Sequence, residues 1–477
     1  MDTQLLHPTV SPDRSICFDK DLIQRYGGRG PRYTSYPTAV QFNELFTASE
    51  YERFARASND SAKPISLYVH IPFCNSLCYY CACNKIITRN EGRVATYLQR
   101  LAQEIDLQSK LFDRSRKVEQ LHFGGGTPTY LNQIQLRLLF AQLRRAFSLD
   151  HSDGREFSIE VDPRSVDADS MQLLAELGFN RISLGVQDFD RKVQLAVNRL
   201  QSKEEVSRLT ESVRELDFRS VSFDLIYGLP HQTIESFDRT LDQTLEMRPD
   251  RLAIYNYAHL PSRFKGQRMI NDADIPSPEC KLEILHHTID KLVGSGYVYI
   301  GMDHFALPDD DLVKAQENGT LQRNFQGYST HGDADLVGLG VSAIGSIGNA
   351  YSQNSTSTKE YEATLSNGVL PVARGVVVDQ DDQFRAAVIQ QLMCYEELNF
   401  AEFDSRFDTD FVAYFAPELQ QVRSLAKDGL LDLDKSRIKV SPKGRLLLRS
   451  IAAVFDRYLN VGNDNSDIDS RQYSKAI

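Results

Sequence analysis

The chain has 477 residues, enough for two or three domains, and its 41% hydrophobic and 25% charged residues are ordinary for a soluble globular protein. The 65 acidic residues outnumber 54 Lys and Arg, and the formal charge of −11 argues against a nucleic-acid partner. The start, "MDTQLLHPTVSPDRS", lacks the regions of a signal peptide, and no apolar run approaches the roughly 18–20 residues that span a bilayer. We therefore expect a cytoplasmic protein with reduced thiols and no membrane partner.

The first predicted segment is an arm over residues 1–60, which includes the Pro- and Tyr-rich "GPRYTSYPTA" at 30–39. From about residue 64 to 305, β-branched or aromatic runs alternate with helical patterns such as 93–112 and 170–179. The runs occupy 66–71, 119–123, 156–161, 180–186, 220–226 and 251–257, and 297–305 is a candidate further strand. This alternation predicts βαβ units and a parallel sheet, either open or closed into a barrel.

A different pattern begins in the last third of the chain. The polar stretch 352–360 predicts a surface loop, and helical patterns follow at 383–398, 417–430 and 442–459, with a hairpin predicted at 430–441. This order resembles a winged helix, which is also a common packing module. The predicted domains are the arm 1–60, a central α/β domain 61–350 and a small C-terminal domain 370–477.

Four of the seven cysteines lie in "HIPFCNSLCYYCACNK", residues 70–85. A reducing compartment disfavours a disulfide, and structural zinc usually takes two separated ligand pairs. A thiol-redox pair would use Cys78 and Cys81 but leaves Cys74 unexplained. Thiolates of Cys74, Cys78 and Cys81 can instead hold three corners of a [4Fe–4S] cluster, which leaves one iron open for substrate chemistry. The isolated cysteines are interpreted as ordinary packing or surface residues: Cys17, Cys280 and Cys394.

The C-x3-C-x2-C loop after a first strand resembles the radical S-adenosylmethionine (SAM) superfamily. The stretch "LYVHIPFCNSLCYYCACNKIITR" is similar to the oxygen-independent coproporphyrinogen III oxidases in particular. Further motifs read like that family in its order, over about residues 20–460: "GPRYTSYPTA", "HFGGGTPTYL", "SIEVDPR", "GVQDF", "VNR", "DLIYGLP", "NYAHLP", "IGMDHFA" and "RNFQGY". The resemblance implies a partial (β/α)6 radical SAM barrel over 61–350, an N-terminal arm over the active site and a mainly helical, winged-helix-like C-terminal domain.

The resemblance also implies an activity. It is the oxidative decarboxylation of two propionates of coproporphyrinogen III to vinyl groups, through a 5′-deoxyadenosyl radical, giving protoporphyrinogen IX. The implied cofactors are a [4Fe–4S] cluster and two SAM molecules. The implied partners are a reductant such as flavodoxin and an unknown electron acceptor, and the chain is expected to be a monomer. The alternatives are a haem-binding relative that acts as a chaperone and a haem-degrading methyltransferase. Cys83 and the "GPRYTSYPT" arm favour the oxidase.

Site residues follow from the family motifs. "GGGTP" (124–128) is not G-x-G-x-x-G and alone could be a plain turn. Without the family pattern, Glu160 and Asp224 would be read as helix caps or ion-paired carboxylates, and Arg199 as the partner of Asp224. The resemblance suggests residues around a first SAM, Tyr68, Gly125, Glu160 and Ile344, and around a second, Tyr80, Gly126, Thr127, Gln187, Arg199, Asp224 and Ala258. The catalytic candidates are Cys83 and Tyr68.

The implied substrate carries four carboxylates, which the fork of an arginine binds in bidentate fashion. The candidate substrate-binding arginines are Arg32, Arg263, Arg268 and Arg323. Their aromatic neighbours are expected to face the pyrrole rings: Tyr33, Phe264 and Phe325. Each arginine considered alone could equally be a solvated surface residue.

Overall fold

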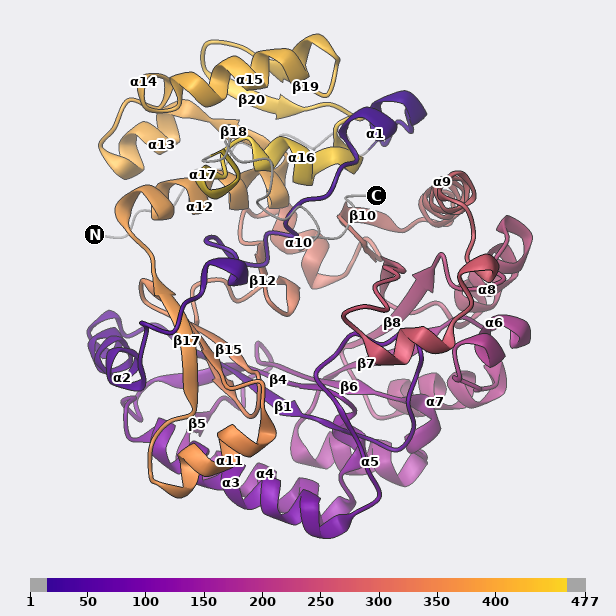
Figure 1. Cartoon of the computed structure of the whole chain (residues 1–477), viewed down its shortest axis with the longest axis vertical. Helices are drawn as coiled ribbons and strands as arrows, with labels where there is room; N and C mark the ends of the chain where they lie inside the picture. Colours follow the sequence, from indigo (N-terminus) through magenta and orange to yellow (C-terminus); the bar gives the residue numbers. More distant parts are fainter. Residues whose placement is uncertain (1–14, 461–477) are drawn as a thin grey trace. The chain divides into compact units, whose positions relative to one another are not determined.

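The computed structural model describes residues 15–460 and divides them into two compact units (Figure 1). The first unit contains the described residues up to Val40, then Ile289–Gly332, then those from Val378. The second contains Gln41–Thr288 and Asp333–Val377. Within 15–460, no helix is both long and apolar enough to cross a membrane. The domain boundaries expected at 60, 350 and 370 remain predictions.

The second unit is built on a mainly parallel sheet, as predicted. Its parallel strands follow one another in the order β9, β8, β7, β6, β4, β1 and β14. The six predicted runs are confirmed as strands: β1 (Ile65–Ile71), β4 (Lys117–Gly125), β6 (Glu156–Val161), β7 (Arg181–Gln187), β8 (Ser220–Tyr227) and β9 (Arg251–Asn256). Parallel strands that alternate with helices along the chain confirm the predicted α/β fold class.

Helices follow the strands and pack beside one another in chain order, in the sequence α3, α4, α5, α7 and α8. Figure 1 shows α3, α4 and α5 on the outer side of β1, β4 and β6. Most of them begin at a side-chain cap, such as Asn90 for α3 and Ser202 for α7, because these residues satisfy free backbone N–H groups. The helices are α2 (Ala48–Ala57), α3 (Glu91–Ser109), α4 (Gln133–Ala146), α5 (Ala168–Leu177), α6 (Arg191–Ala196), α7 (Lys203–Glu215), α8 (Ile234–Met247) and α9 (Pro278–Gly294).

Beyond β1 the sheet continues through β14 (Asp335–Leu339) and then turns antiparallel, through β15 (Ile344–Ile347), β16 (Ala350–Asn354) and β17 (Val372–Val377). The prediction of a surface loop at 352–360 was therefore wrong. Residues 352–354 end β16, and α11 (Thr358–Ser366) follows. The stretch looked exposed because it is polar, but Gln353 and Asn354 are buried and hydrogen-bonded. Short strands complete the unit: β2 (Phe73–Cys74), β3 (Ile86–Ile87) and β5 (Ser148–Leu149).

The first unit is mainly helical around its own apolar core, which includes Phe384, Phe411, Phe415 and Leu392. Its helices are α1 (Lys20–Tyr26), α10 (Asp311–Glu317), α12 (Gln380–Tyr395), α13 (Phe400–Phe407), α14 (Phe411–Tyr414), α15 (Ala416–Lys427), α16 (Leu448–Ala453) and α17 (Arg457–Asn460). A small sheet joins β18 (Glu397–Asn399), β20 (Arg437–Val440) and β19 (Leu431–Leu433), which confirms the predicted hairpin.

Two further hairpins belong to the first unit. The single strand predicted at 297–305 is instead the pair β10 (Val298–Gly301) and β11 (His304–Ala306). The chain reverses there because Gly301 and Met302 both have positive φ, at 145° and 56°. The second hairpin joins β12 (Gln322–Asn324) to β13 (Gly327–Ser329).

A buried carboxylate connects α3 to the loop between β14 and β15. Glu104 is fully buried and accepts three hydrogen bonds, from the Gly340 N–H at 2.7 Å, Asn354 Nδ2 at 2.7 Å and the Tyr361 hydroxyl at 2.6 Å. Within residues 15–460 it forms no ion pair with a basic side chain. Burial raises its pKa to about 7. The loop held by these bonds leads directly into Ile344 at the start of β15.

This carboxylate should make stability depend on pH. Its folded-state pKa lies above the usual 4.5, so the folded state binds more protons than the unfolded state, and unfolding free energy falls as pH rises from about 4.5 to about 7. Each unit of pKa shift corresponds to about 1.4 kcal/mol. Glu104→Gln removes this titration. The loss of unfolding free energy in the variant, relative to wild type, should therefore be smaller at pH 8 than at pH 5. Thermal unfolding of both proteins at the two pH values measures this loss, and substitution of an exposed glutamate, Glu215→Gln, is the control. Equal destabilisation by Glu104→Gln at both pH values would contradict it.

Candidate active site

The cysteine loop starts at the carboxyl end of β1, the edge where parallel α/β sheets bind ligands. Strand β2 pairs with β3, so that Cys74 lies beside Ile87 and the intervening residues form a closed loop. The Thr88 N–H donates to the Cys74 carbonyl at 3.3 Å, and the Cys81 N–H donates to the Cys78 carbonyl at 3.2 Å. Cys78 is buried, Cys74 and Cys81 are half-buried, and Cys83 is exposed.

Hydrogen-bond donors surround the three predicted ligand thiols. Thr127 Oγ1 lies 3.5 Å from Cys74 Sγ, and both Arg164 Nη2 and Arg199 Nη1 lie 3.5 Å from Cys78 Sγ. A hydrogen bond from Cys83, together with the ammonium of Lys85, lowers the pKa of Cys81 to about 6.

These residues fit an iron–sulfur cluster better than a single metal ion. Within residues 15–460, no three of the loop cysteines bring their sulfur atoms within 4.8 Å of one another, as one tetrahedral ion would require. A cluster needs thiolate ligands farther apart and adds negative charge to the site. Arg164 and Arg199 provide two positive charges at the sulfur of Cys78. The three predicted ligands could therefore hold a [4Fe–4S] cluster.

The strands beside the loop direct alternate side chains toward the inner face of the sheet. In β6, β7 and β8, half-buried positions alternate with fully buried ones. The half-buried positions of β6 and β8 include two predicted SAM residues, Glu160 and Asp224. Because neighbouring strands are in register, such residues share one face.

Tyr68 and Glu160, two residues expected around the first SAM, lie on either side of His122. The rings of Tyr68 and His122 stack with centroids 5.8 Å apart, and His122 Nε2 lies 3.2 Å from Glu160 Oε1. The other ring nitrogen of His122 lies 2.5 Å from Ser158 Oγ. The sequence analysis missed His122, although its position in "EQLHF", two residues before the glycines, was a usable signal.

The glycines that end β4 are needed for close backbone contacts. Gly125 has φ of 120°, and its N–H donates to Glu160 Oε2 at 3.2 Å. A Cβ on Gly126 would lie 2.7 Å from the carbonyl group of Pro72, at the start of the cysteine loop. Larger residues would therefore displace the loop, so "GGGTP" is more than a plain turn.

Two residues expected around the second SAM, Arg199 and Gln187, both place the ends of their side chains next to Gly185. A Cβ on Gly185 would meet Gln187 Nε2 at 2.9 Å and Arg199 Nη2 at 3.0 Å. Gln187 has a φ of 67°, which is uncommon for a non-glycine residue and is concentrated at functional sites. Arg199 is 6% exposed, and its Nε has no hydrogen-bond partner within residues 15–460.

The ion pair considered for Arg199 and Asp224 does not form. Arg199 Nη1 lies 3.3 Å from Asp162, which also pairs with Arg164 at 2.6 Å. Asp224 accepts a hydrogen bond from Ser183 at 3.0 Å, and burial raises its pKa to about 7. Asp162 and Arg164 were missed although both lie in the quoted motif "SIEVDPR", directly after β6.

Two other predicted residues are linked by a buried glutamine. Gln267 Nε2 donates to the Tyr80 carbonyl at 3.0 Å and to the Ala258 carbonyl at 3.2 Å. This contact ties the cysteine loop to the segment after β9. The main chain of Ile344 approaches Gly338, the strand partner of Tyr68, so closely that a Cβ added at Gly338 would lie 2.7 Å from the Ile344 carbonyl oxygen.

The structure does not gather all four predicted arginines in one unit. Arg263 and Arg268 are exposed in the second unit, where Arg268 Nε donates to the Pro261 carbonyl at 3.0 Å. Arg32 and Arg323 belong to the first unit. The prediction that Tyr33 faces substrate was wrong: it is buried in the apolar core, and its hydroxyl donates to Asp456 at 3.1 Å.

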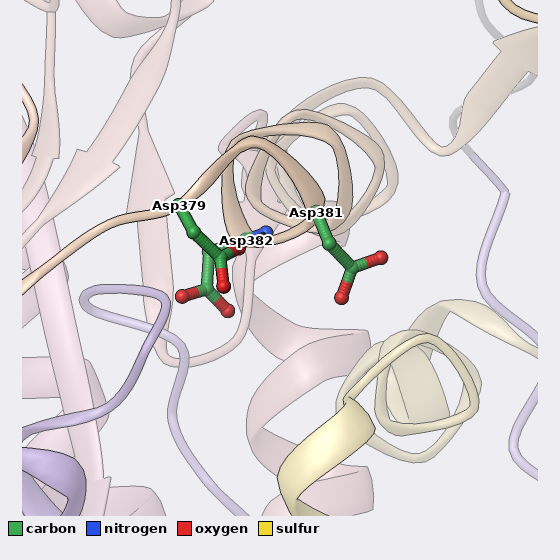
Figure 2. A group of neighbouring side chains, drawn as sticks. All are labelled: Asp379, Asp381 and Asp382. Atoms are coloured by element: carbon green, nitrogen blue, oxygen red, sulfur yellow. Dashed lines mark hydrogen bonds between the residues drawn. The ribbon is translucent and has the colours of Figure 1, made fainter.

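Figure 2 shows another cluster, of Asp379, Asp381 and Asp382, around the start of α12. It is the one group within residues 15–460 with at least three His, Cys, Asp or Glu ligand atoms within 4.8 Å of one another. Arg457 pairs with all three carboxylates at 2.7–3.1 Å, and Arg385 also contacts Asp381. Because arginines already neutralise the cluster, we interpret it as structural.

Comparisons with known proteins agree with this geometry. The radical SAM superfamily matches residues 68–244, and the HemN C-terminal domain matches 378–447. The curated oxygen-independent coproporphyrinogen III oxidase of Pseudomonas aeruginosa is 55% identical to this chain, over 93% of this chain and 97% of the relative. That of Escherichia coli is 50% identical, over 94% of this chain and 96% of the relative. The relative from Synechocystis is 44% identical over 93% and 96%.

A solved structure gives the same result. The chain aligns with a structure described as coproporphyrinogen III oxidase (HemN) from Escherichia coli, a radical SAM enzyme, with a TM-score of 0.88 and 48% identity. The alignment covers 93% of this chain and 100% of that one. The two domain matches, the long alignments and the three-thiol loop lead to one conclusion: this chain belongs to the oxygen-independent coproporphyrinogen III oxidase family of radical SAM enzymes.

Proposed function

We propose that this chain catalyses the oxygen-independent oxidative decarboxylation of two propionate side chains of coproporphyrinogen III, giving the two vinyl groups of protoporphyrinogen IX. Each conversion of –CH2CH2COO⁻ to –CH=CH2 releases CO2, one proton and two electrons. The observation that carries the proposal is the thiol loop of Cys74, Cys78 and Cys81, beside Tyr68, His122 and Glu160, in a chain 55% identical to a curated oxidase.

The cluster and SAM, when bound, supply a 5′-deoxyadenosyl radical that removes one hydrogen atom from the propionate β-carbon. The protein's part is to bind and orient. Cys74, Cys78 and Cys81 would hold the cluster, with the guanidinium of Arg199 balancing its charge. Glu160, held by the Gly125 N–H and by His122, offers a fixed carboxylate to an ammonium or hydroxyl of SAM.

Two SAM molecules would supply one radical for each propionate without release of the half-converted substrate. Support comes from the polar groups present beyond the Tyr68, Gly125 and Glu160 set, namely Gln187, Arg199 and Asp224. We also propose a low-potential protein of the flavodoxin type as electron donor. The electron left after each loss of CO2 requires a one-electron acceptor. We expect a monomer in the cytoplasm.

The test is an anaerobic reaction of cluster-reconstituted protein with SAM, a reductant and coproporphyrinogen III. Mass spectrometry should find loss of two CO2 and four hydrogen atoms, with formation of 5′-deoxyadenosine. Cys74→Ser protein is the matched control and should form neither product. Tight porphyrinogen binding without any conversion would reject the oxidase and favour the haem-binding alternative.

A further inference from the structure

The hairpin of β12 and β13 in the first unit carries a buried arginine that lacks an anionic partner. Arg323 is 6% exposed, and its guanidinium lies 4.9 Å from the ring centroid of Tyr328, its cross-strand neighbour. Its Nε donates to the main-chain carbonyl of Arg32 at 3.1 Å. Among residues 15–460, no carboxylate pairs with Arg323, and its buried Nη1 has no hydrogen-bond acceptor. Buried charges are normally paired, so this arginine requires an anion from outside the described chain.

Arg32 differs from Arg323 in this respect. Its Nη2 pairs with Asp303, which lies in the turn between β10 and β11, and its side chain is 35% exposed. Its charge is therefore compensated before any ligand arrives. Of the two arginines in this unit predicted to bind substrate, Arg323 has the stronger physical requirement for a carboxylate.

A second donor on the same hairpin is also without a partner. Gln326 lies in the turn between β12 and β13, three residues after Arg323. Its buried Nε2 makes no hydrogen bond within the described residues. The turn itself is well defined, because the Gln326 N–H donates to Asn324 Oδ1 at 2.8 Å and Gly327 has a φ of 108°. The Nη1 of Arg323 and the Nε2 of Gln326 are both buried and both lack an acceptor within the described residues, so each offers N–H donors to a carboxylate oxygen.

We infer that Arg323 and Gln326 form a subsite for one carboxylate of the tetrapyrrole substrate. The inference rests on the proposed function, since it names residues that hold that substrate. The Arg32 carbonyl fixes the guanidinium of Arg323 and the Tyr328 ring covers it, so little side-chain freedom is lost on binding. Asp303 restricts Arg32 to holding the arm segment, so this arginine is not the main carboxylate receptor.

The experiment measures binding of coproporphyrinogen III to cluster-reconstituted protein by anaerobic equilibrium dialysis. The bound ligand is quantified by its fluorescence after oxidation to the porphyrin. Arg323→Gln should lower affinity about 10- to 100-fold, the range for a lost charged hydrogen-bond pair, and Gln326→Leu about 3- to 10-fold. The matched control is Arg423→Gln, an exposed arginine of α15 in the same unit, which should bind like wild type.

Ionic strength separates a carboxylate contact from a packing effect. Affinity should fall with added salt in wild type and in Arg423→Gln, and less steeply in Arg323→Gln, because one charge pair is missing. Equal affinity and equal salt dependence in Arg323→Gln and Arg423→Gln would overturn the inference. If Arg323→Gln does not fold, the test uses Gln326→Leu in its place. Unchanged affinity of that variant for coproporphyrinogen III overturns the inference. A wild-type protein that does not bind coproporphyrinogen III would instead reject the proposed function.

Discussion

Replacement of Cys74, Cys78 or Cys81 by serine is expected to abolish iron–sulfur binding, the largest effect of any substitution considered. A cluster held by two thiolates is labile, and a serine hydroxyl is a far weaker ligand for iron than a thiolate. At Cys78 the substitution also removes the sulfur that Arg164 and Arg199 both contact at 3.5 Å. Iron and sulfide content per chain after anaerobic reconstitution measures the effect.

The control comes from cysteines outside the loop. Cys17 is exposed and Cys280 half-buried, and neither contacts the loop within the described residues, so both serine variants should bind iron like wild type. The variant Cys83→Ser tests whether Cys83 is a ligand of the cluster or only lies near it. If the cluster uses three ligands, this variant keeps its iron. Full iron content in Cys78→Ser protein would remove this loop from the cluster site.

Arg199→Ala should reduce SAM binding from two molecules per chain to one and suppress vinyl formation. The guanidinium is buried above Gly185, beside Gln187, and its Nε has no acceptor within residues 15–460. A methionyl carboxylate would supply that acceptor. The first SAM should be unaffected, because Tyr68, Gly125 and Glu160 make no direct contact with Arg199 in the described chain. Equilibrium dialysis with labelled SAM under anaerobic conditions gives the stoichiometry.

Arg164→Ala is a matched control for this variant. Arg164, like Arg199, pairs with Asp162 and donates to Cys78 Sγ at 3.5 Å, but it is not among the predicted SAM residues. It should therefore retain two SAM molecules. Loss of the second SAM in both variants would mean that the effect passes through Asp162 and Cys78. If wild type binds one SAM, or Arg199→Ala still binds two, the second-site role of Arg199 is refuted.

The alternation of elements in the second unit could be predicted because each strand and helix carries its own periodicity. The six strand runs from 66 to 257 all form parallel strands, since buried strands require continuous apolar or β-branched residues. The stretch at 352–354 could not be assigned this way. Its polar residues are buried, and one of the partners of Asn354, the carboxylate of Glu104, lies 250 residues away in the chain. Periodicity carries no information on such distant partners.

The cysteine loop could be proposed as a cluster site from sequence alone because its three predicted ligands lie within eight residues and need only a local turn. The surroundings of those ligands depend on the fold. His122 stacks on Tyr68, Arg199 pairs with Asp162 and not with Asp224, and Tyr33 enters the core. Each of these contacts joins separate strands or helices, whose register and packing a motif does not encode.

The family motifs, the three predicted cluster ligands and the glycine turn beside them could all be read from local sequence. Which charges are compensated became visible only in the folded chain. Both Arg32 and Arg323 were predicted to bind substrate, but Arg32 is paired with Asp303, whereas Arg323 is buried and has no carboxylate partner within residues 15–460. The physical reason is that the cost of burying a charge depends on groups brought together by folding, and Arg32 and Asp303 lie 271 residues apart in the chain.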